Sequence, residues 1–357
     1  MTIGIHVKAG EKAYQIIKDG GFAWNRITTY FAPAGGPKWL IAGGFDLTLL
    51  KSGLLGNGAP ILLVGASAGA WRFAAWIQPE AESSYRAFME AYIHTSYKKN
   101  DTPQTVLKSL GDIINAYIAD DALPFALNHK KYRLAVITAR AKSMLGSDRK
   151  LLQMTGVGFF YLLNLIDRSR IYRLAERVVF YNAPKPPFFC LPNTAFKGRC
   201  FPLNETNFKH AIVASGALPI YVAGVRDIYG APIGNYRDGG LIDYHLTHRF
   251  NAREDELTLF LHHQERIIPG WFDKKLKSRR PSQDALANVV MVYPTESFVA
   301  QLPNGKVPDR EDFRTYLNDQ PARVKVWQQA AAMAAPLGEQ FVELMESGKI
   351  RDAVEIL

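Results

Sequence analysis

The chain has 357 residues, of which 48% are hydrophobic and 21% are charged. This composition excludes a disordered chain, and the length suffices for one large α/β domain or two modest ones. The net charge of +10 favours anionic partners without choosing among lipid headgroups, nucleic acid and acidic substrates. The sequence shows no zinc-ligand spacing, nucleic-acid motif or internal repeat. We therefore expect no metal, no other cofactor and no nucleic-acid partner.

The N-terminal sequence has no apolar stretch behind a basic one, which predicts that a secretory signal is absent. The longest apolar run, residues 151–166, is shorter than the ~20 residues that a membrane-spanning helix needs. We expect a buried core helix there, with a helix lying in a lipid interface as the alternative. Cys190 and Cys200 could form a disulfide bond with each other, but we expect both to be reduced thiols. The sequence thus predicts a cytoplasmic protein, with peripheral membrane contact left open.

Short apolar runs alternate along the chain with helical patterns. Most of the runs are continuous rather than alternating, which is typical of strands in a sheet covered on both faces. This order predicts a three-layer α/β/α fold with a mainly parallel central sheet. The expected strands are residues 26–32, 60–65, 133–138, 178–182, 256–262 and 289–293, and the expected helices include residues 37–51, 68–77, 80–97 and 206–218.

The chain is expected to divide into three parts. Residues 1–25 form an N-terminal segment, residues 26–300 the main α/β domain, and residues 301–357 a C-terminal helical extension. From residue 320 onward we expect helices only, because the sequence there is rich in residues of high helix propensity.

The sharpest motif is G-A-S-A-G at residues 65–69, which follows an apolar strand and opens a helix. A serine on such a tight turn is strained and exposes its Oγ at a helix N-terminus, where the dipole favours developing negative charge. The small residues Gly65 and Gly69 let the strand and the helix approach closely. G-x-S-x-G is common by chance, but here the strand and the helix occupy the required places. We interpret Ser67 as a nucleophile.

A second motif, A-G-G-P-K at residues 34–38, follows an earlier strand. Consecutive glycines leave backbone N–H groups uncovered, as an oxyanion hole requires. Gly35 and Gly36, together with Ala68 after the serine, are therefore the candidate oxyanion donors. Lys38 is a candidate for binding a phosphate or orienting the loop, with a solvated lysine at a helix start as the alternative.

A third motif, D-G-G at residues 238–240, supplies a candidate general base. A base must lie within hydrogen-bond reach of its nucleophile, and two glycines let the backbone carry the Asp238 carboxylate close to Ser67. Asp-Gly is also a common turn, so this interpretation depends on the three motifs together.

The order of these motifs resembles that of the patatin-like phospholipases: a glycine-rich oxyanion loop, a G-x-S-x-G elbow and then D-G-G. The segment A-S-G-A-L-P at residues 214–219 is similar to the A-S-x-A-x-P segment of that family. The resemblance spans residues 26–243 and is more specific than any single motif. It implies a patatin-like fold, a Ser67–Asp238 dyad without a catalytic histidine, and hydrolysis of acyl esters in lipids. The expected substrate is a lipid or a small ester.

The oxyanion loop departs from the family pattern at Pro33, Ala34 and Trp39. Ala34 keeps a backbone N–H, so we expect the oxyanion hole to survive. Trp39 adds bulk beside the loop, which is expected to affect rate and substrate size more than reaction type. Trp39 also favours one alternative, a non-catalytic lipid-binding protein that has kept the fold.

Two other interpretations concern histidines and a basic segment. An α/β-hydrolase esterase with a Ser–Asp–His triad is the nearest alternative, since four histidines follow Asp238 in the sequence. They are His245, His248, His262 and His263. Residues 271–280, W-F-D-K-K-L-K-S-R-R, combine aromatic and basic side chains. This combination suits docking on an anionic membrane surface, with a solvated loop as the alternative.

Overall fold

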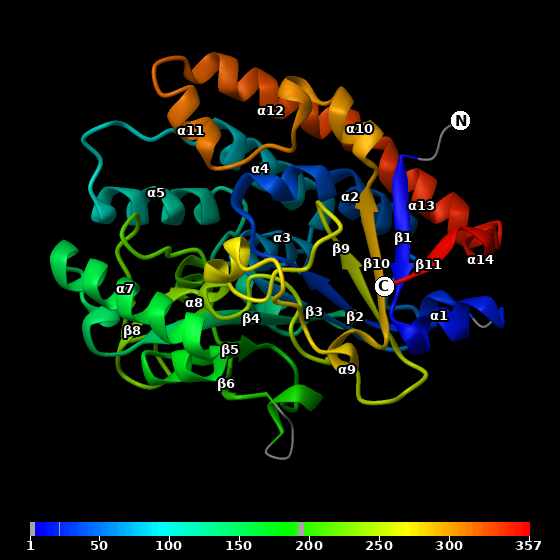
Figure 1. Cartoon of the computed structure of the whole chain (residues 1–357), viewed down its shortest axis with the longest axis horizontal. Coiled ribbons are helices and arrows are strands. Elements are labelled where there is room, and N and C mark those ends of the chain that lie inside the picture. The colour runs from blue at the N-terminus through cyan, green and yellow to red at the C-terminus, as the bar shows by residue number, and fades with distance from the viewer. Residues whose placement is uncertain (1–3, 21, 192–195) are drawn as a thin grey trace.

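The computed structural model describes residues 4–20, 22–191 and 196–357. A central sheet of 11 strands runs through the molecule, and helices pack on its two faces (Figure 1). The strand order is β11-β1-β10-β9-β2-β3-β4-β5-β6, with β8 paired to β4 and β7 paired to β8. The central strands β10, β9, β2, β3 and β4 are all parallel neighbours. The predicted α/β fold with a mainly parallel central sheet is confirmed.

All six predicted strands are present, and their continuous apolar sequences are explained by burial on both sides. They are β2 (Ile27–Ala32), β3 (Ile61–Ala66), β4 (Tyr132–Ala141), β5 (Ala175–Tyr181), β9 (Leu257–Leu261) and β10 (Val289–Pro294). Five further strands were not predicted, because they are short or polar. They are β1 (Ile5–Ala9), β6 (Gly198–Pro202), β7 (Val225–Arg226), β8 (Asn235–Asp238) and β11 (Val354–Ile356).

The helices of the first half connect and cover these strands. They are α1 (Glu11–Lys18), α2 (Gly43–Ser52), α3 (Ala68–Trp76), α4 (Ala81–His94), α5 (Pro103–Asn115), α6 (Leu123–Leu127) and α7 (Lys150–Ile166). The later ones are α8 (Phe208–Ser215), α9 (Gln283–Leu286), α10 (Glu296–Gln301), α11 (Glu311–Thr315), α12 (Gln320–Ala334), α13 (Pro336–Glu346) and α14 (Ile350–Ala353). Three short 3-10 helices border the candidate site: η2 (Gly36–Ala42), η6 (Gly239–Leu241) and η7 (Trp271–Lys275).

Both ends of the chain join the central sheet. The strand β1 pairs antiparallel with β10, so the N-terminal segment shares the sheet of the main domain. The strand β11 pairs parallel with β1, with Val354 opposite Val7. The expectation of helices only after residue 320 is therefore wrong at residues 354–356. β-branched residues such as Val354 suit this edge position. The short strand was not predicted because the sequence before it has high helix propensity.

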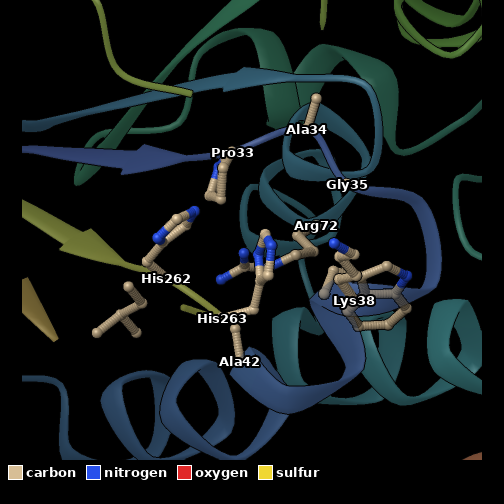
Figure 2. A pocket seen from close by; sticks show the side chains of 10 residues that line it. Pro33, Ala34, Gly35, Lys38, Ala42, Arg72, His262 and His263 are labelled. Atoms are coloured by element: carbon tan, nitrogen blue, oxygen red, sulfur yellow. The ribbon is translucent and has the colours of Figure 1, made fainter. Parts of the chain in front are cut away.

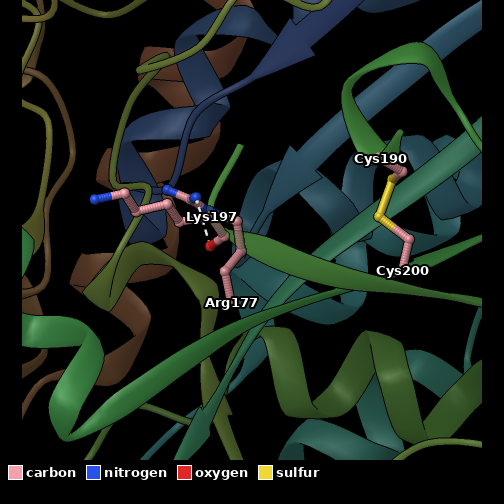
Figure 3. The surroundings of a disulfide bond; sticks show 4 residues. All are labelled: Arg177, Cys190, Lys197 and Cys200. Atoms are coloured by element: carbon pink, nitrogen blue, oxygen red, sulfur yellow. Dashed lines mark hydrogen bonds between the residues drawn. A yellow bond between two sulfur atoms is a disulfide. The ribbon is translucent and has the colours of Figure 1, made fainter. Parts of the chain in front are cut away.

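The two cysteines form a disulfide bond, so the expectation of reduced thiols is wrong for this structure (Figure 3). The strand β6 pairs with β5 so that Cys200 lies opposite Val179. The Cα atoms of Cys190 and Cys200 are 5.9 Å apart, a usual spacing for a disulfide. Beside it, the Arg177 guanidinium donates to the Lys197 carbonyl at 3.0 Å.

The helix α7 is not the core helix that its apolar sequence predicted. Its buried residues are Gln153, Gly156, Phe160 and Asn164, and most of its other apolar side chains are exposed. Across residues 4–20, 22–191 and 196–357, no helix is both long and apolar enough to pass through a bilayer.

Candidate active site

Ser67 stands on a sharp turn between β3 and α3. Its φ is 54°, in the left-handed region that serine rarely adopts. A side chain at Gly69 would place its Cβ 2.2 Å from the Ala32 carbonyl oxygen, and one at Gly65 would lie 2.5 Å from the Ala70 nitrogen. The glycines therefore allow the close approach of helix and strand that was inferred from the motif.

The register of three strands brings Asp238 to Ser67. The strand β3 runs parallel to β4 with Ala66 opposite Ile137, and the next β4 residue, Thr138, lies opposite Asp238 on β8. Ser67, the first residue after β3, therefore lies beside Asp238, the last residue of β8. The Ser67 hydroxyl donates to Asp238 Oδ2 at 3.0 Å, although 171 residues separate the two in sequence.

The environment of Asp238 favours its action as a base. Burial raises the pKa of this carboxyl above its usual value, because a carboxylate loses hydration in the interior. Four groups oppose the rise: the Arg310 guanidinium, the Gly240 N–H, the Ser67 hydroxyl and the Lys274 ammonium. Arg310 Nη2 lies 3.8 Å from Asp238 Oδ2, and the Gly240 N–H donates to Oδ1 at 2.7 Å. A carboxylate with a raised pKa accepts a proton more readily.

Free backbone donors lie beside the dyad. In the described part of the chain, the N–H groups of Gly35, Gly36 and Ala68 donate to no acceptor. The preceding N–H, that of Ala34, is already bonded to the Tyr244 carbonyl at 2.9 Å. Gly36 has a φ of 59°, which any larger residue would adopt with strain. The three donors proposed from the sequence thus have no partner within the described chain.

Trp39 does not crowd this loop. Its ring stacks on Phe88 with centroids 4.5 Å apart and meets Tyr85 edge-on at 6.0 Å, so the indole points into the core. The side chain is 4% exposed. The feature that favoured a non-catalytic protein is therefore a core contact between η2 and α4.

Ser215 supports the serine turn, a role that sequence reasoning missed. Its hydroxyl accepts from the Ser67 N–H at 2.8 Å and donates to the Ile137 carbonyl at 2.7 Å. The residue is fully buried at the end of α8. The segment A-S-G-A-L-P marked the place, but nothing in it indicated which group the hydroxyl would bind.

Three cations lie near the oxyanion loop or the dyad, and one of them, Lys38, was a predicted site residue. Lys38 is half-buried on η2, and desolvation lowers its pKa. The Lys274 ammonium lies 4.5 Å from the centre of the Tyr244 ring, and desolvation, Arg310 and Lys38 lower its pKa to about 7. Arg310 covers the oxyanion loop, since a Cβ at Gly36 would lie 2.8 Å from its Nε. In the described chain neither lysine forms an ion pair, although Asp309 is close enough to act on the pKa of both.

The histidines gather beside the oxyanion loop without joining the dyad. Figure 2 shows the rings of His262 and His263 beyond the end of β9, facing the loop of Pro33, Ala34 and Gly35. The fourth histidine, His248, lies away from this group, with its Nε2 3.8 Å from Asp243 Oδ1. Among residues 4–20, 22–191 and 196–357, no imidazole hydrogen-bonds to Ser67 or Asp238. The geometry therefore does not assemble a Ser–Asp–His triad.

Three of these rings lie close enough to suggest a metal site, and their hydrogen bonds argue against it. The candidate ligand atoms of His245, His262 and His263 all lie within 4.8 Å of one another. The Ile268 N–H donates to His245 Nδ1 at 2.8 Å, so the proton of this neutral ring sits on Nε2 and leaves no lone pair there for a metal. That Nε2 lies 3.3 Å from His262 Nε2 and donates to it. Burial lowers the pKa of all three imidazoles, which keeps them neutral.

Comparisons with known proteins add little to this geometry. No family model matches the chain, and no curated protein matches it. Among solved structures, the chain is similar to the crystal structure of VipD from Legionella pneumophila, with 12% identity and a TM-score of 0.32. That match covers 87% of this chain and 67% of the other. A likeness of this size carries no argument about function.

Proposed function

We propose that the chain hydrolyses carboxylic esters of lipids, with Ser67 as nucleophile and Asp238 as general base. The observation that carries the proposal is the hydrogen bond of 3.0 Å from the Ser67 hydroxyl to the Asp238 carboxylate, beside free N–H groups. A serine alone is a weak nucleophile and needs an adjacent base. The resemblance of the motifs to patatin-like phospholipases supports the same reaction.

The proton path follows from the contacts. As Ser67 Oγ attacks the ester carbonyl, its proton passes to Asp238 Oδ2, and the oxyanion accepts from the N–H groups of Gly35, Gly36 and Ala68. Collapse of the tetrahedral intermediate breaks the bond to the leaving alcohol, which takes the proton from Asp238. Water then attacks the acyl-enzyme and gives its proton to Asp238. The second collapse releases the fatty acid and returns the proton to Ser67.

The charge around the dyad supports an ester that carries an anionic group. Lys38, Arg310 and Lys274 repel one another at this site, and an anionic substituent such as a phosphate would offset part of that repulsion. In the closed arrangement Ser67 is 3% and Asp238 is 2% exposed. The Arg310 side chain lies over the loop and must move or bind the substrate for the ester to enter.

Hydrolysis of a chromogenic acyl ester by purified protein tests the proposal. Ser67→Ala and Asp238→Asn are each expected to lower kcat at least ~100-fold while the circular dichroism spectrum stays unchanged. Ser52→Ala, at the end of α2, is a matched control that should retain full activity. Retained turnover in the Ser67 variant would refute the nucleophile. Wild-type protein that binds lipid without turnover would favour the non-catalytic alternative.

A further inference from the structure

The helix α7 presents its polar side to the protein and its apolar side to solvent. It contains no acidic residue, and its only charged residue is Lys150 at the start. Two of its four buried residues are the amides Gln153 and Asn164. The exposed apolar residues are Leu151 (79%), Leu152 (43%), Met154 (48%), Phe159 (49%), Leu162 (54%), Leu165 (39%) and Ile166 (64%). A surface helix of a globular protein normally shows the opposite pattern.

Specific contacts hold α7 in this orientation. Near its start, Gln153 accepts from the Ile220 N–H at 2.6 Å and donates to the Ser147 carbonyl at 2.8 Å. Near its end, Asn164 donates to Asp273 Oδ1 at 2.7 Å. A rotation that buried the leucines would break both sets of hydrogen bonds and leave buried amides without partners. The outward apolar face is therefore a stable feature of the fold.

The middle of the helix is fixed by close packing. A Cβ at Gly156 would lie 2.4 Å from the Leu145 nitrogen, so only glycine allows this approach. Phe160 is buried and meets the Phe272 ring at 5.4 Å. The helix thus lies against the 3-10 helix that contains Leu145 and against η7.

Cations border this apolar face on three sides. Arg149 and Lys150 are exposed at the start of α7, and Arg170 and Arg173 are exposed after its end, together with one acidic residue, Asp167. The third border is the segment after η7, which Arg279 joins to α7 by donating to the Asn164 amide oxygen at 3.1 Å. The exposed cations at this border are Lys275, the last residue of η7, and Lys277 and Arg280 after it. In the part of the chain that the structure describes, none of these seven cations forms an ion pair.

We propose that α7 and its cationic border, which we call the α7 face, dock on an anionic phospholipid surface. The apolar side chains enter the acyl region while the unpaired cations meet the headgroups, which is the arrangement of an interfacial helix. A second copy of the chain fits this face poorly, because a two-fold contact would bring the same cations together. The helix lies flat, since its 17 residues span only ~25 Å.

The α7 face is connected to the candidate site through η7. Asp273 of η7 accepts from Asn164 of α7, and the next residue, Lys274, lies over the Tyr244 ring beside the oxyanion loop. Docking of α7 would bring lipid to the side of the molecule from which Lys274 reaches the dyad. The segment 271–280, for which the sequence left membrane docking and a solvated loop as alternatives, forms part of this same face.

Vesicle flotation of the full chain tests the proposal, with phosphatidylcholine vesicles compared with vesicles that also contain phosphatidylserine. The wild type is expected to bind the anionic vesicles, and the double variant Leu162→Glu/Ile166→Glu to bind them at least ~10-fold more weakly. Ile356→Glu is the matched control, because Ile356 is 61% exposed on β11, far from α7 (Figure 1). This control should bind like the wild type. Circular dichroism checks that each variant is folded.

A second variant keeps the test independent of apolar substitutions. Lys150→Glu/Arg173→Glu should weaken binding to anionic vesicles and leave the weaker binding to pure phosphatidylcholine unchanged. Equal binding by wild type and both variants, or no binding by the wild type, would overturn the proposal. A third result would also overturn it: wild-type protein that binds no vesicles but self-associates in sedimentation, with Leu162→Glu/Ile166→Glu abolishing the self-association. Binding does not depend on Ser67, so Ser67→Ala should float like the wild type even if the chain proves not to be a hydrolase.

Discussion

The guanidinium of Arg310 lies 3.8 Å from the carboxylate of Asp238, at the same oxygen that accepts the Ser67 hydroxyl. Arg310 belongs to the C-terminal part of the chain, just before α11, whereas Ser67 and Asp238 belong to the central sheet. The C-terminal part therefore contributes directly to the electrostatics of the dyad. This contact makes the pH dependence of the reaction a sensitive probe of the site.

Arg310→Gln should shift the acid limb of kcat/KM to higher pH. The guanidinium lowers the pKa of Asp238, and burial raises it, so removing Arg310 raises the pKa further. Because the base must be ionised, activity is lost as pH falls through that pKa, and the loss then begins at higher pH. A pH profile measured with a soluble neutral ester checks this. Arg314→Gln, an exposed arginine on α11, is the control and should leave the profile unchanged.

Lys274 should produce an alkaline limb with anionic esters only. Its pKa is lowered to about 7, so its charge is present below that pH and disappears above it. We expect KM for a phosphate-bearing ester to rise as pH increases through about 7, while KM for a neutral ester does not. Lys274→Arg keeps the charge throughout and should remove the limb. An unchanged limb in this variant would show that another group titrates.

Ser215→Ala should destabilise the fold and slow the reaction. The substitution leaves the buried N–H of Ser67 without its acceptor, a loss of ~1–3 kcal/mol in the free energy of unfolding. The strained turn at Ser67 would also relax, so kcat should fall more than KM changes. Denaturant unfolding and steady-state kinetics measure the two effects. Ser83→Ala, an exposed serine on α4, should change neither.

Cys190 and Cys200 should give no free thiol in denatured, unreduced protein. Their disulfide closes a short loop, and the chain-entropy model gives a contribution of about 3 kcal/mol to the free energy of unfolding. Reduction should therefore lower Tm, and Cys190→Ser/Cys200→Ser should lower it by a similar amount. Two reactive thiols per chain in protein purified without reductant would contradict the bond.

The sequence was sufficient for the central strands and for the turn at Ser67, because both depend on local patterns. Continuous apolar runs predicted β2, β3, β4 and β9, and small residues around Ser67 predicted the sharp turn. The contact between Ser67 and Asp238 was inferred from motif order. Its physical basis, the antiparallel pairing of the short polar strand β8 with β4, has no sequence signal.

The parts that the sequence missed depend on tertiary contacts. Arg310 lies in a segment without a motif and reaches the site only because the C-terminal helices fold back over it. The apolar sequence of α7 predicted a core helix, since periodicity cannot show that Gln153 and Asn164 would find partners inside. The Cys190–Cys200 bond likewise depends on the pairing of β6 with β5.

Covalent labelling with a fluorophosphonate, followed by mass spectrometry of the digested protein, tests the central claim most directly. We expect one phosphonyl group per chain on the peptide that contains Ser67, and slower labelling in Asp238→Asn because the base is lost. Labelling of a different serine would contradict the assignment of Ser67 as nucleophile. So would the absence of any label in folded protein that hydrolyses esters.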